Sequence, residues 1–420
     1  MKKKVVSALL VSVMVMGLAA GCGSSGDGDG GSGSDGGDGG EITYWSMWTN
    51  AEPQGKVIQE AADAYEEETG VHVNIEWKGR DVKNILGSAL EAEENIDLFD
   101  DGYERITENY VDYLADLTEM ADAAGYADKS YALFNDVVTN KTGFLCCVTE
   151  QPQVGGVFYN KDLFEDAGIT ETPATWEDFL AASQALVDAG YQPLALDSTY
   201  APFLFGYHLA RHIGEEEVAN LTTNGGWSQN AGAVQAAQEM VDYVKAGYLA
   251  DGAPDEYPAS QNKIGIDQNV AMVVCANYVT SEVNNTAGEE LNWGLFNYPS
   301  VEGGVDATSA YAGANSLAIP KYSENQQEAF DFAMFLVTGE YDQKMADEAG
   351  QIPADPSNTA PASQSGTTEV LNNTTDVLSW NMGLDSNAEK VATIQEVIVQ
   401  MYEGAYASGE EVMAAMDALY

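Results

Sequence analysis

The chain has 420 residues, 45% of them hydrophobic, and a formal net charge of −50 at neutral pH. This length and apolar content suit two domains of ordinary size, each with its own core. So acidic a surface repels phosphate backbones and anionic lipid head groups, which makes nucleic acid a poor partner. With only 17 Lys and Arg residues, the chain favours a neutral or cationic ligand over a strongly anionic one.

The N-terminus has the pattern of an export signal. Three lysines at positions 2–4 precede an apolar run over residues 5–18, which is too short for a comfortable transmembrane helix and suits a signal peptide. The run ends in Leu18-Ala19-Ala20-Gly21-Cys22, which resembles a bacterial lipobox, although Ala19 stands where that motif usually has Leu. We expect a signal peptide over residues 1–21 and lipidation of Cys22. An ordinary cleaved signal beside an unrelated Cys is the alternative.

Residues 23–40 consist only of Gly, Ser and Asp. Such a segment has no apolar surface to bury against its chain entropy, so it is expected to be a flexible linker spanning roughly 20–25 Å. Together with Cys22, this segment would tether a globular body to the outer face of the cell membrane.

The body opens with alternating strand and helix patterns. We predict strands at 41–45, 71–77 and 96–99, and helices from Pro53 to about Gly70 and over 82–92. An alternating order of this kind predicts an α/β layer with a largely parallel sheet.

The alternation continues through the second half of the chain, where Thr175 is expected to cap a helix through Asp178. The predicted strands lie at 155–159, 193–196, 271–275 and 291–296. The predicted helices lie at 231–246, 326–337, 388–402 and 410–419. Two α/β lobes of comparable size follow from this order.

Three cysteines remain after Cys22, too few for a disulfide framework. Cys146 and Cys147 lie in an apolar stretch, 144–148, that is typical of a strand, so we interpret all three as buried, inert thiols. A bond between Cys275 and one of the pair is the alternative, since exported proteins reach oxidising compartments in which disulfides form.

Several catalytic patterns are missing. His208 and His212 are four residues apart, but the residues between them lack the zinc-protease pattern, so we interpret them as ordinary helix residues. The chain has no phosphate-binding Gly loop, no dinucleotide motif after a strand and no nucleophile elbow. We therefore expect no cofactor and no metal. Paired carboxylates such as Asp100-Asp101 are abundant, which leaves a glycoside hydrolase as the enzyme alternative.

A family resemblance rests on several segments. The most specific are Val157-Phe-Tyr-Asn-Lys-Asp-Leu-Phe-Glu-Asp-Ala-Gly-Ile169 and Thr172-Pro-Ala-Thr-Trp-Glu-Asp-Phe179; others are Tyr65-Glu-Glu-Glu-Thr-Gly-Val71, Ala318-Ile-Pro-Lys-Tyr-Ser323 and Ile352-Pro-Ala354. With gaps, over about residues 41–360, these segments resemble the family 1 extracellular solute-binding proteins of ABC importers, which include the maltose-binding proteins.

The resemblance implies a two-lobe, type II periplasmic-binding-protein-like fold with the ligand cleft between the lobes. It places the strand crossings near 149–155, 311–315 and 355–360. The N-terminal lobe would comprise 41–150 plus 314–356, and the C-terminal lobe 151–313 plus 357–420. It also implies a monomeric binding protein rather than an enzyme, which closes on its ligand and delivers it to an ABC permease.

Candidate ligand contacts in the first lobe follow the ends of strands, where ligands bind in open α/β sheets. Trp48 could stack on a sugar face, while the other candidates could accept hydroxyl protons. The alternatives are core packing for Trp48, helix capping for Asn50, a solvated acidic turn for the Asp pair and a loop surface for Gln153. The first-lobe candidates are Trp48, Asn50, Glu52, Asp100, Asp101 and Gln153.

The candidates in the second lobe follow two predicted strands or lie at the second crossing. The resemblance places aromatic residues where related proteins often have Trp, and Gly313 would allow close backbone approach. Core packing is the alternative for each aromatic ring. The second-lobe candidates are Asp197, Tyr200, Phe203, Asn277, Tyr278, Tyr311, Gly313 and Trp380.

These residue types suit a mono- or oligosaccharide. Aromatic rings bury the flat apolar faces of a pyranose, and Asp, Asn and Gln pair with its hydroxyl groups. Tyr and Phe in place of Trp make a maltose-type specificity doubtful, and a polyol is another possible ligand. A surface adhesion or sensing module that binds glycan without import is a further alternative.

Overall fold

The computed structural model describes residues 40–420. The predicted signal peptide, Cys22 and the linker up to residue 39 lie outside the described residues. Among the residues described, no helix is both long and apolar enough to cross a membrane.

The first lobe is built on three parallel strands. β1 (Glu41–Ser46) pairs with β2 (His72–Trp77) on one side and with β3 (Leu98–Gly102) on the other. The helices of this lobe are α1 (Pro53–Thr69), α2 (Val82–Glu91), α3 (Tyr103–Arg105), α4 (Thr118–Ala124), α5 (Ala132–Thr142), α13 (Gln326–Val337) and α14 (Gly339–Ala349).

Local sequence explains α1 well. Pro53 occupies its first turn, where a missing N–H costs nothing, and Gly70 ends it in the left-handed conformation at φ 80°. Val57, Ile58 and Tyr65 lie on its buried face. The predicted bounds of this helix are confirmed, as are those of α13.

The second lobe has a smaller sheet. β5 (Gln192–Ala195) pairs in parallel with β6 (Val270–Ala276), and β7 (Trp293–Phe296) pairs with β4. The predicted capping box is present, since the Thr175 hydroxyl accepts from the Asp178 N–H. The helices of the second lobe are α6 (Lys161–Asp166), α7 (Trp176–Ala189), α8 (Ala201–Ile213), α9 (Glu215–Asn224), α10 (Ala231–Lys245), α11 (Ala259–Ile266), α12 (Tyr278–Ala287), α16 (Val391–Tyr402) and α17 (Gly409–Asp417).

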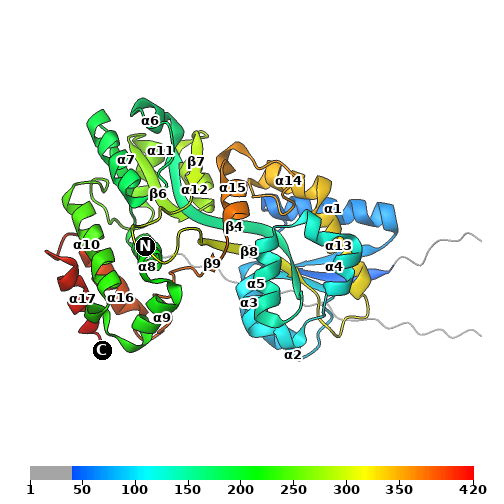
Figure 1. The fold of residues 1–420 in the computed structure, drawn as a ribbon. Helices are drawn as coiled ribbons and strands as arrows, with labels where there is room; N and C mark the ends of the chain where they lie inside the picture. Colours follow the sequence, from blue (N-terminus) through cyan, green and yellow to red (C-terminus); the bar gives the residue numbers. More distant parts are fainter. Residues whose placement is uncertain (1–39) are drawn as a thin grey trace, which may run out of the picture. The chain divides into compact units, whose positions relative to one another are not determined.

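Two long strands connect the lobes. β4 (Cys147–Asn160) and β8 (Ala310–Ala318) pair antiparallel and lie side by side (Figure 1). β4 then continues into the second lobe, where it pairs with β6 and β7. The two-residue strand β9 (Val377–Leu378) follows α15 (Thr367–Asn373) and pairs with β8.

The connecting strands correct two expectations. The segments 144–148 and 155–159 were expected as separate strands, but residues 147–160 form one strand. The sheet is also less parallel than predicted, because β8 pairs antiparallel with both β3 and β4. A register shift between Thr149 and Gln151 precedes Pro152, an irregularity of the kind that lets a strand accommodate proline.

The buried apolar side chains form two clusters. One surrounds β1, β3 and α13, with Tyr44 and Phe99 at its centre; the other surrounds α8, α10 and α16. Cys146, Cys147 and Cys275 are buried free thiols, as the sequence predicts. The fold is therefore the expected α/β fold with two lobes.

Candidate functional site

The five aromatic residues predicted as ligand contacts in the second lobe lie together. We call Tyr200, Phe203, Tyr278, Tyr311 and Trp380 the aromatic cluster. Their positions along the chain give no sign of this proximity. Trp380 lies beyond residue 360, outside the part of the sequence that carries the family resemblance.

Trp380 is central to the aromatic cluster. Its ring centroid lies 4.4 Å from that of Phe203, 5.0 Å from that of Tyr311 and 6.2 Å from that of Tyr200. The Tyr278 hydroxyl is 3.4 Å from the Tyr200 hydroxyl. The pairs with Tyr200 and Tyr311 are edge-to-face, an arrangement that aromatic rings prefer, and the pair with Phe203 is tilted by 34°.

The aromatic cluster has a buried side and a more open side. Phe203, Tyr311 and Tyr200 are only 0%, 7% and 8% exposed, so they form part of the core. Tyr278 and Trp380 are half-buried. Tyr257, 43% exposed, packs edge-on against Tyr200 at 5.7 Å and extends the cluster toward solvent. Only this outer side can contact a ligand in the present conformation.

Four chain segments position the five rings of the cluster, and Tyr278 is the first residue of α12. Tyr200 ends a short turn of helix and Phe203 lies in the first turn of α8, while Tyr311 lies on β8. Trp380 follows β9, whose pairing with β8 brings the C-terminal part of the chain to this place. Gly155 makes the packing possible, because a Cβ there would lie 2.8 Å from Phe203 Cζ.

Two residues of the first lobe approach the cluster directly after β3. The Tyr103 hydroxyl donates to the Ala312 carbonyl at 3.3 Å. Burial raises the pKa of Tyr311, and the nearby charge of Glu104 raises it further. Glu104 is half-buried, and burial raises the pKa of its own carboxyl group. Sequence analysis missed this carboxylate because it chose the Asp100-Asp101 pair, which ends three residues earlier.

The predicted Asp pair serves the local fold. Asp100 is fully buried and accepts from the Tyr44 hydroxyl, from Ser46 Oγ at 2.9 Å and from the Met47 N–H at 2.5 Å. Burial raises the pKa of Asp100 to about 6. Asp101 is equally buried and forms an ion pair with Arg105.

Trp48, Asn50 and Glu52 lie in one loop between β1 and α1. The Arg80 guanidinium lies 4.3 Å above the Trp48 ring and pairs with Glu52 at 2.8 Å. Glu52 also accepts from the Thr49 N–H at 2.8 Å, so its carboxylate holds the loop closed. Asn50 is exposed beside it.

Glu150 is a second carboxylate that sequence analysis missed. It lies on β4, is 2% exposed, and its Oε2 is buried without a hydrogen-bond partner. Burial and the charge of Asp100 raise the pKa of Glu150 well above its usual value, while the Gln151 amide, which donates to Glu150 Oε1 at 3.4 Å, acts in the opposite direction. An acid within a strand of otherwise buried residues is the only sequence signal that could have identified it.

Of the remaining candidates, the side chains of Asp197 and Asn277 accept from backbone N–H groups. Asp197 accepts from the N–H groups of Ser260 and Gln261 at 2.7 and 3.1 Å, at the start of α11. Asn277 Oδ1 accepts from the Val154 N–H at 3.2 Å. Gln153 is half-buried on β4, opposite Gly313 on β8. The Asp197 carbonyl accepts from the Tyr200 N–H at 2.9 Å, while its carboxylate is turned to α11 and away from the rings.

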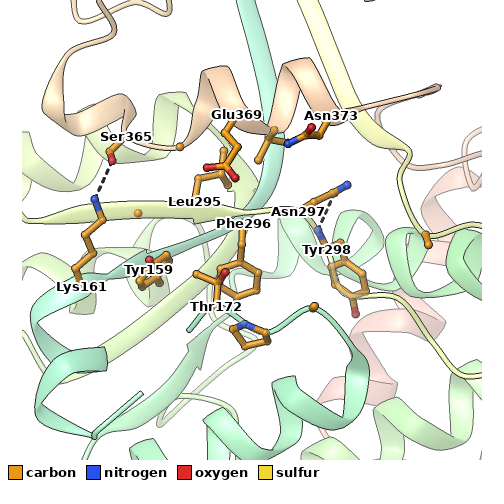
Figure 2. A pocket seen from close by; sticks show the side chains of 16 residues that line it. Tyr159, Lys161, Thr172, Leu295, Phe296, Asn297, Tyr298, Ser365, Glu369 and Asn373 are labelled. Carbon is orange, nitrogen blue, oxygen red and sulfur yellow. Dashed lines mark hydrogen bonds between the residues drawn. The ribbon is translucent and has the colours of Figure 1, made fainter. Parts of the chain in front are cut away.

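A hollow of about 520 Å³ lies elsewhere on the second lobe (Figure 2). Glu369 and Asn373 of α15 line one side and Thr172 and Phe296 the other, while Lys161 donates to Ser365 at 2.8 Å. None of the residues predicted from sequence lines this hollow.

Comparison with known proteins identifies the family. A family model described as bacterial extracellular solute-binding protein matches residues 48–343, which is more than half of the chain. The diacetylchitobiose-binding protein DasA of Streptomyces coelicolor is 26% identical over 372 residues, covering 84% of this chain and 82% of that protein. The galactooligosaccharide-binding protein of Bacillus subtilis is 24% identical, covering 47% of this chain and 46% of that protein.

Other matches are shorter or are structural. The chain matches about half the length of binding proteins from Brucella abortus and Brucella suis, at 24% identity over 199 residues. The structure of a probable secreted solute-binding lipoprotein from Streptomyces coelicolor superposes with a TM-score of 0.72 at 16% identity, covering 91% of this chain and 99% of that one. That likeness confirms the two-lobe fold. The family works outside the cytoplasm, and the chain belongs to it: it is a bacterial extracellular solute-binding protein.

Proposed function

We propose that this protein binds a mono- or oligosaccharide between its two lobes and delivers it to the permease of an ABC importer. Relatives that bind diacetylchitobiose and galactooligosaccharide support a carbohydrate as the ligand. The family match supports reversible binding rather than turnover.

The observation that carries the proposal is the convergence of the aromatic cluster, with the Glu104 carboxyl group close enough to Tyr311 for its charge to act on that phenol. Tyr278 and Trp380 offer partly exposed ring surface on which a pyranose could lie. Glu104 could accept its hydroxyl protons, and charge-assisted hydrogen bonds of this kind are among the stronger ones in proteins. Both the flat faces and the hydroxyl rim of a sugar are then recognised.

We assign the remaining sequence candidates by their surroundings. Gln153 and Gly313 face one another on the crossing strands, and Trp48 packs beside the unpartnered oxygen of Glu150. A buried polar atom without a partner is costly, so a hydroxyl group of the ligand or a water is expected there. We retain Asn50, Glu52, Asp100, Asp101, Asp197 and Asn277 as residues that shape the loops around the ligand.

We also propose the lobe boundaries implied by the family resemblance: residues 41–150 with 314–356, and residues 151–313 with 357–420. Tyr311 then lies at a passage between the lobes and Trp380 packs against it, so closure would tighten the aromatic cluster around a ligand. Small-angle scattering should show a smaller radius of gyration with saturating sugar, and an unchanged radius would argue against closure.

The proposal also includes a lipid anchor at the N-terminus of the mature protein. Cys22 would carry the lipid, and the Gly/Ser/Asp linker would hold a monomeric body at the outer face of the membrane. Metabolic labelling with a palmitate analogue should mark the wild-type chain and leave Cys22→Ala unlabelled. Labelling of the variant would contradict lipidation at this residue.

Calorimetry on a carbohydrate panel, with product analysis of the same samples, tests the ligand class. Chitooligosaccharides, galactooligosaccharides and a polyol are the first ligands to try. Binding with the ligand recovered intact is the expected result. Released product would favour the glycoside hydrolase, and binding without uptake by cells carrying the protein would favour an adhesion or sensing module.

A further inference from the structure

We propose that His208, His212 and Glu239 form a binding site for a divalent transition metal such as zinc. The site would join helices α8 and α10 inside the second lobe. It is separate from the aromatic cluster, and nothing in the proposed sugar binding requires it.

The three ligand atoms converge on one point. His208 Nε2 lies 2.8 Å and His212 Nε2 3.1 Å from the same oxygen, Oε2 of Glu239. All three atoms lie within 4.8 Å of one another. In a tetrahedral zinc site with bonds of 2.0–2.1 Å, neighbouring ligand atoms are about 3.3 Å apart. To admit the ion, the two contacts to Glu239 would lengthen by a few tenths of an ångström and the two ring nitrogens would settle at a similar separation.

Helix geometry explains why these residues meet. His208 and His212 are four residues apart on α8, so both rings project from the same face of the helix. α10 packs against that face and supplies Glu239. Sequence analysis considered the two histidines alone and found no third ligand, because Glu239 lies on a different helix.

His208 and Glu239 each make a further contact on the side away from the site, which orients the atom that would bind the metal, as in known metal sites. The Tyr298 hydroxyl lies 3.2 Å from His208 Nδ1, which leaves Nε2 to face the site. Gln235 donates to Oε1 of Glu239 at 3.0 Å, so Oε2 is the oxygen turned toward the two rings. The Trp176 ring packs 4.4 Å from the His208 ring and fixes its plane.

The chemistry of the three groups also suits a metal. Zinc binds imidazole nitrogens in their neutral form, and a carboxylate ligand adds a negative charge. Arg211, the chain neighbour of His212, is already paired with Asp306 at 2.6 Å.

The site is accessible from one side. The His208 side chain is fully buried, but that of Glu239 is 24% exposed. This opening provides an entry route and room for a water as the fourth ligand, as in zinc sites with three protein ligands. Since the same α8 carries Phe203 in its first turn, a bound metal would stabilise the helix that supports the aromatic cluster.

Metal titration of the untagged full chain, after chelator treatment, tests the proposal. Zn²⁺ should raise the melting temperature by several degrees at one equivalent, and Co²⁺ should give the visible absorption of a tetrahedral nitrogen and oxygen site. The affinity should fall at least tenfold in His212→Gln and Glu239→Gln. His72→Gln is the matched control, because His72 is exposed and paired only with Glu66.

Three results would overturn the proposal. These are no Co²⁺ spectrum at one equivalent, unchanged affinity in both site variants, or a loss of affinity in His72→Gln alone. A thiolate-to-cobalt absorption band would instead assign the ion to the cysteines. Circular dichroism of each variant without metal keeps the comparison valid, since a misfolded variant would be recognised and replaced by Gln235→Ala, which removes only the contact to Oε1.

Discussion

The rings of Phe203 and Trp380 lie 4.4 Å apart and are tilted by 34°. Phe203 lies in the first turn of α8 and Trp380 follows β9, so this contact joins the middle of the chain to its C-terminal part. Phe203 is buried, whereas Trp380 is half-buried and turns part of its ring toward solvent. The pair thus has one side in the core and one side available to a ligand.

Trp380→Ala should weaken sugar binding by roughly ten- to a hundredfold, because burying a large apolar side chain contributes about 1.5–3 kcal/mol. Calorimetry with the best sugar of the panel measures the change. Tyr341→Ala is the control, since Tyr341 is a half-buried aromatic residue that packs on Phe335 in the first lobe. Equal affinity in Trp380→Ala and the wild type would exclude Trp380 from the site.

Glu104→Gln should lower the affinity about tenfold, since it replaces a charge-assisted hydrogen bond to a sugar hydroxyl with a neutral one. Glu108→Gln is the control, because it makes the same chemical change nearby. Glu108 is exposed and pairs with Lys141, so this variant should bind sugar with the wild-type affinity. Equal losses in both variants would point to long-range charge instead of a direct contact.

Gly155→Ala should lower the free energy of unfolding by about 1–3 kcal/mol, the usual cost of overpacking a core. The added Cβ would lie 2.8 Å from Phe203 Cζ and 3.0 Å from Tyr311 Cδ1, so both rings must shift. Sugar affinity should fall with them. In Gly87→Ala the Cβ would lie 3.5 Å from Tyr110, an ordinary contact, so denaturant unfolding should show little loss.

Asp100 should make the protein less stable as the pH rises from about 4 to 6. Burial raises the pKa of its carboxyl group to about 6, so between these pH values the folded state binds the proton more tightly than the unfolded state. The contribution of the Asp100 carboxyl group to the free energy of unfolding is therefore greatest below about pH 4 and is lost as the pH rises through about 6.

Asp100→Asn should flatten that part of the profile, measured as melting temperature against pH for both proteins. Asn keeps an oxygen that can accept from the Met47 N–H, so the variant is expected to fold. Asp101→Asn is the control because its partner is the Arg105 guanidinium. An unchanged slope between pH 4 and 6 would assign the effect to other carboxylates.

Sequence patterns predicted the regular elements well where the signals were local. The Pro53 start and Gly70 end of α1, and the Thr175 capping box, are short-range features that tertiary packing did not change. Sequence analysis divided β4 in two because the segment 149–154, which contains Pro152, interrupts the apolar pattern. Its pairing with β8, which comes from far along the chain, keeps it continuous.

Sequence analysis predicted the types of residue in the candidate site better than the role of each residue. All the aromatic candidates of the second lobe gather in one cluster, since hydrophobic rings at strand ends tend to pack together. The acidic candidates differ: Asp100 and Asp197 bind backbone N–H groups and are buried. Among so many carboxylates, only three-dimensional contacts distinguish Glu104 and Glu150 from their neighbours.

A crystal structure of the protein with the tightest-binding sugar of the panel tests the central claim most directly. We expect the sugar, chemically intact, between the two lobes, with a ring face on Trp380 or Tyr278 and a hydroxyl group donating to Glu104. Sugar bound instead in the hollow between β7 and α15, or on a surface remote from the aromatic cluster, would contradict the account.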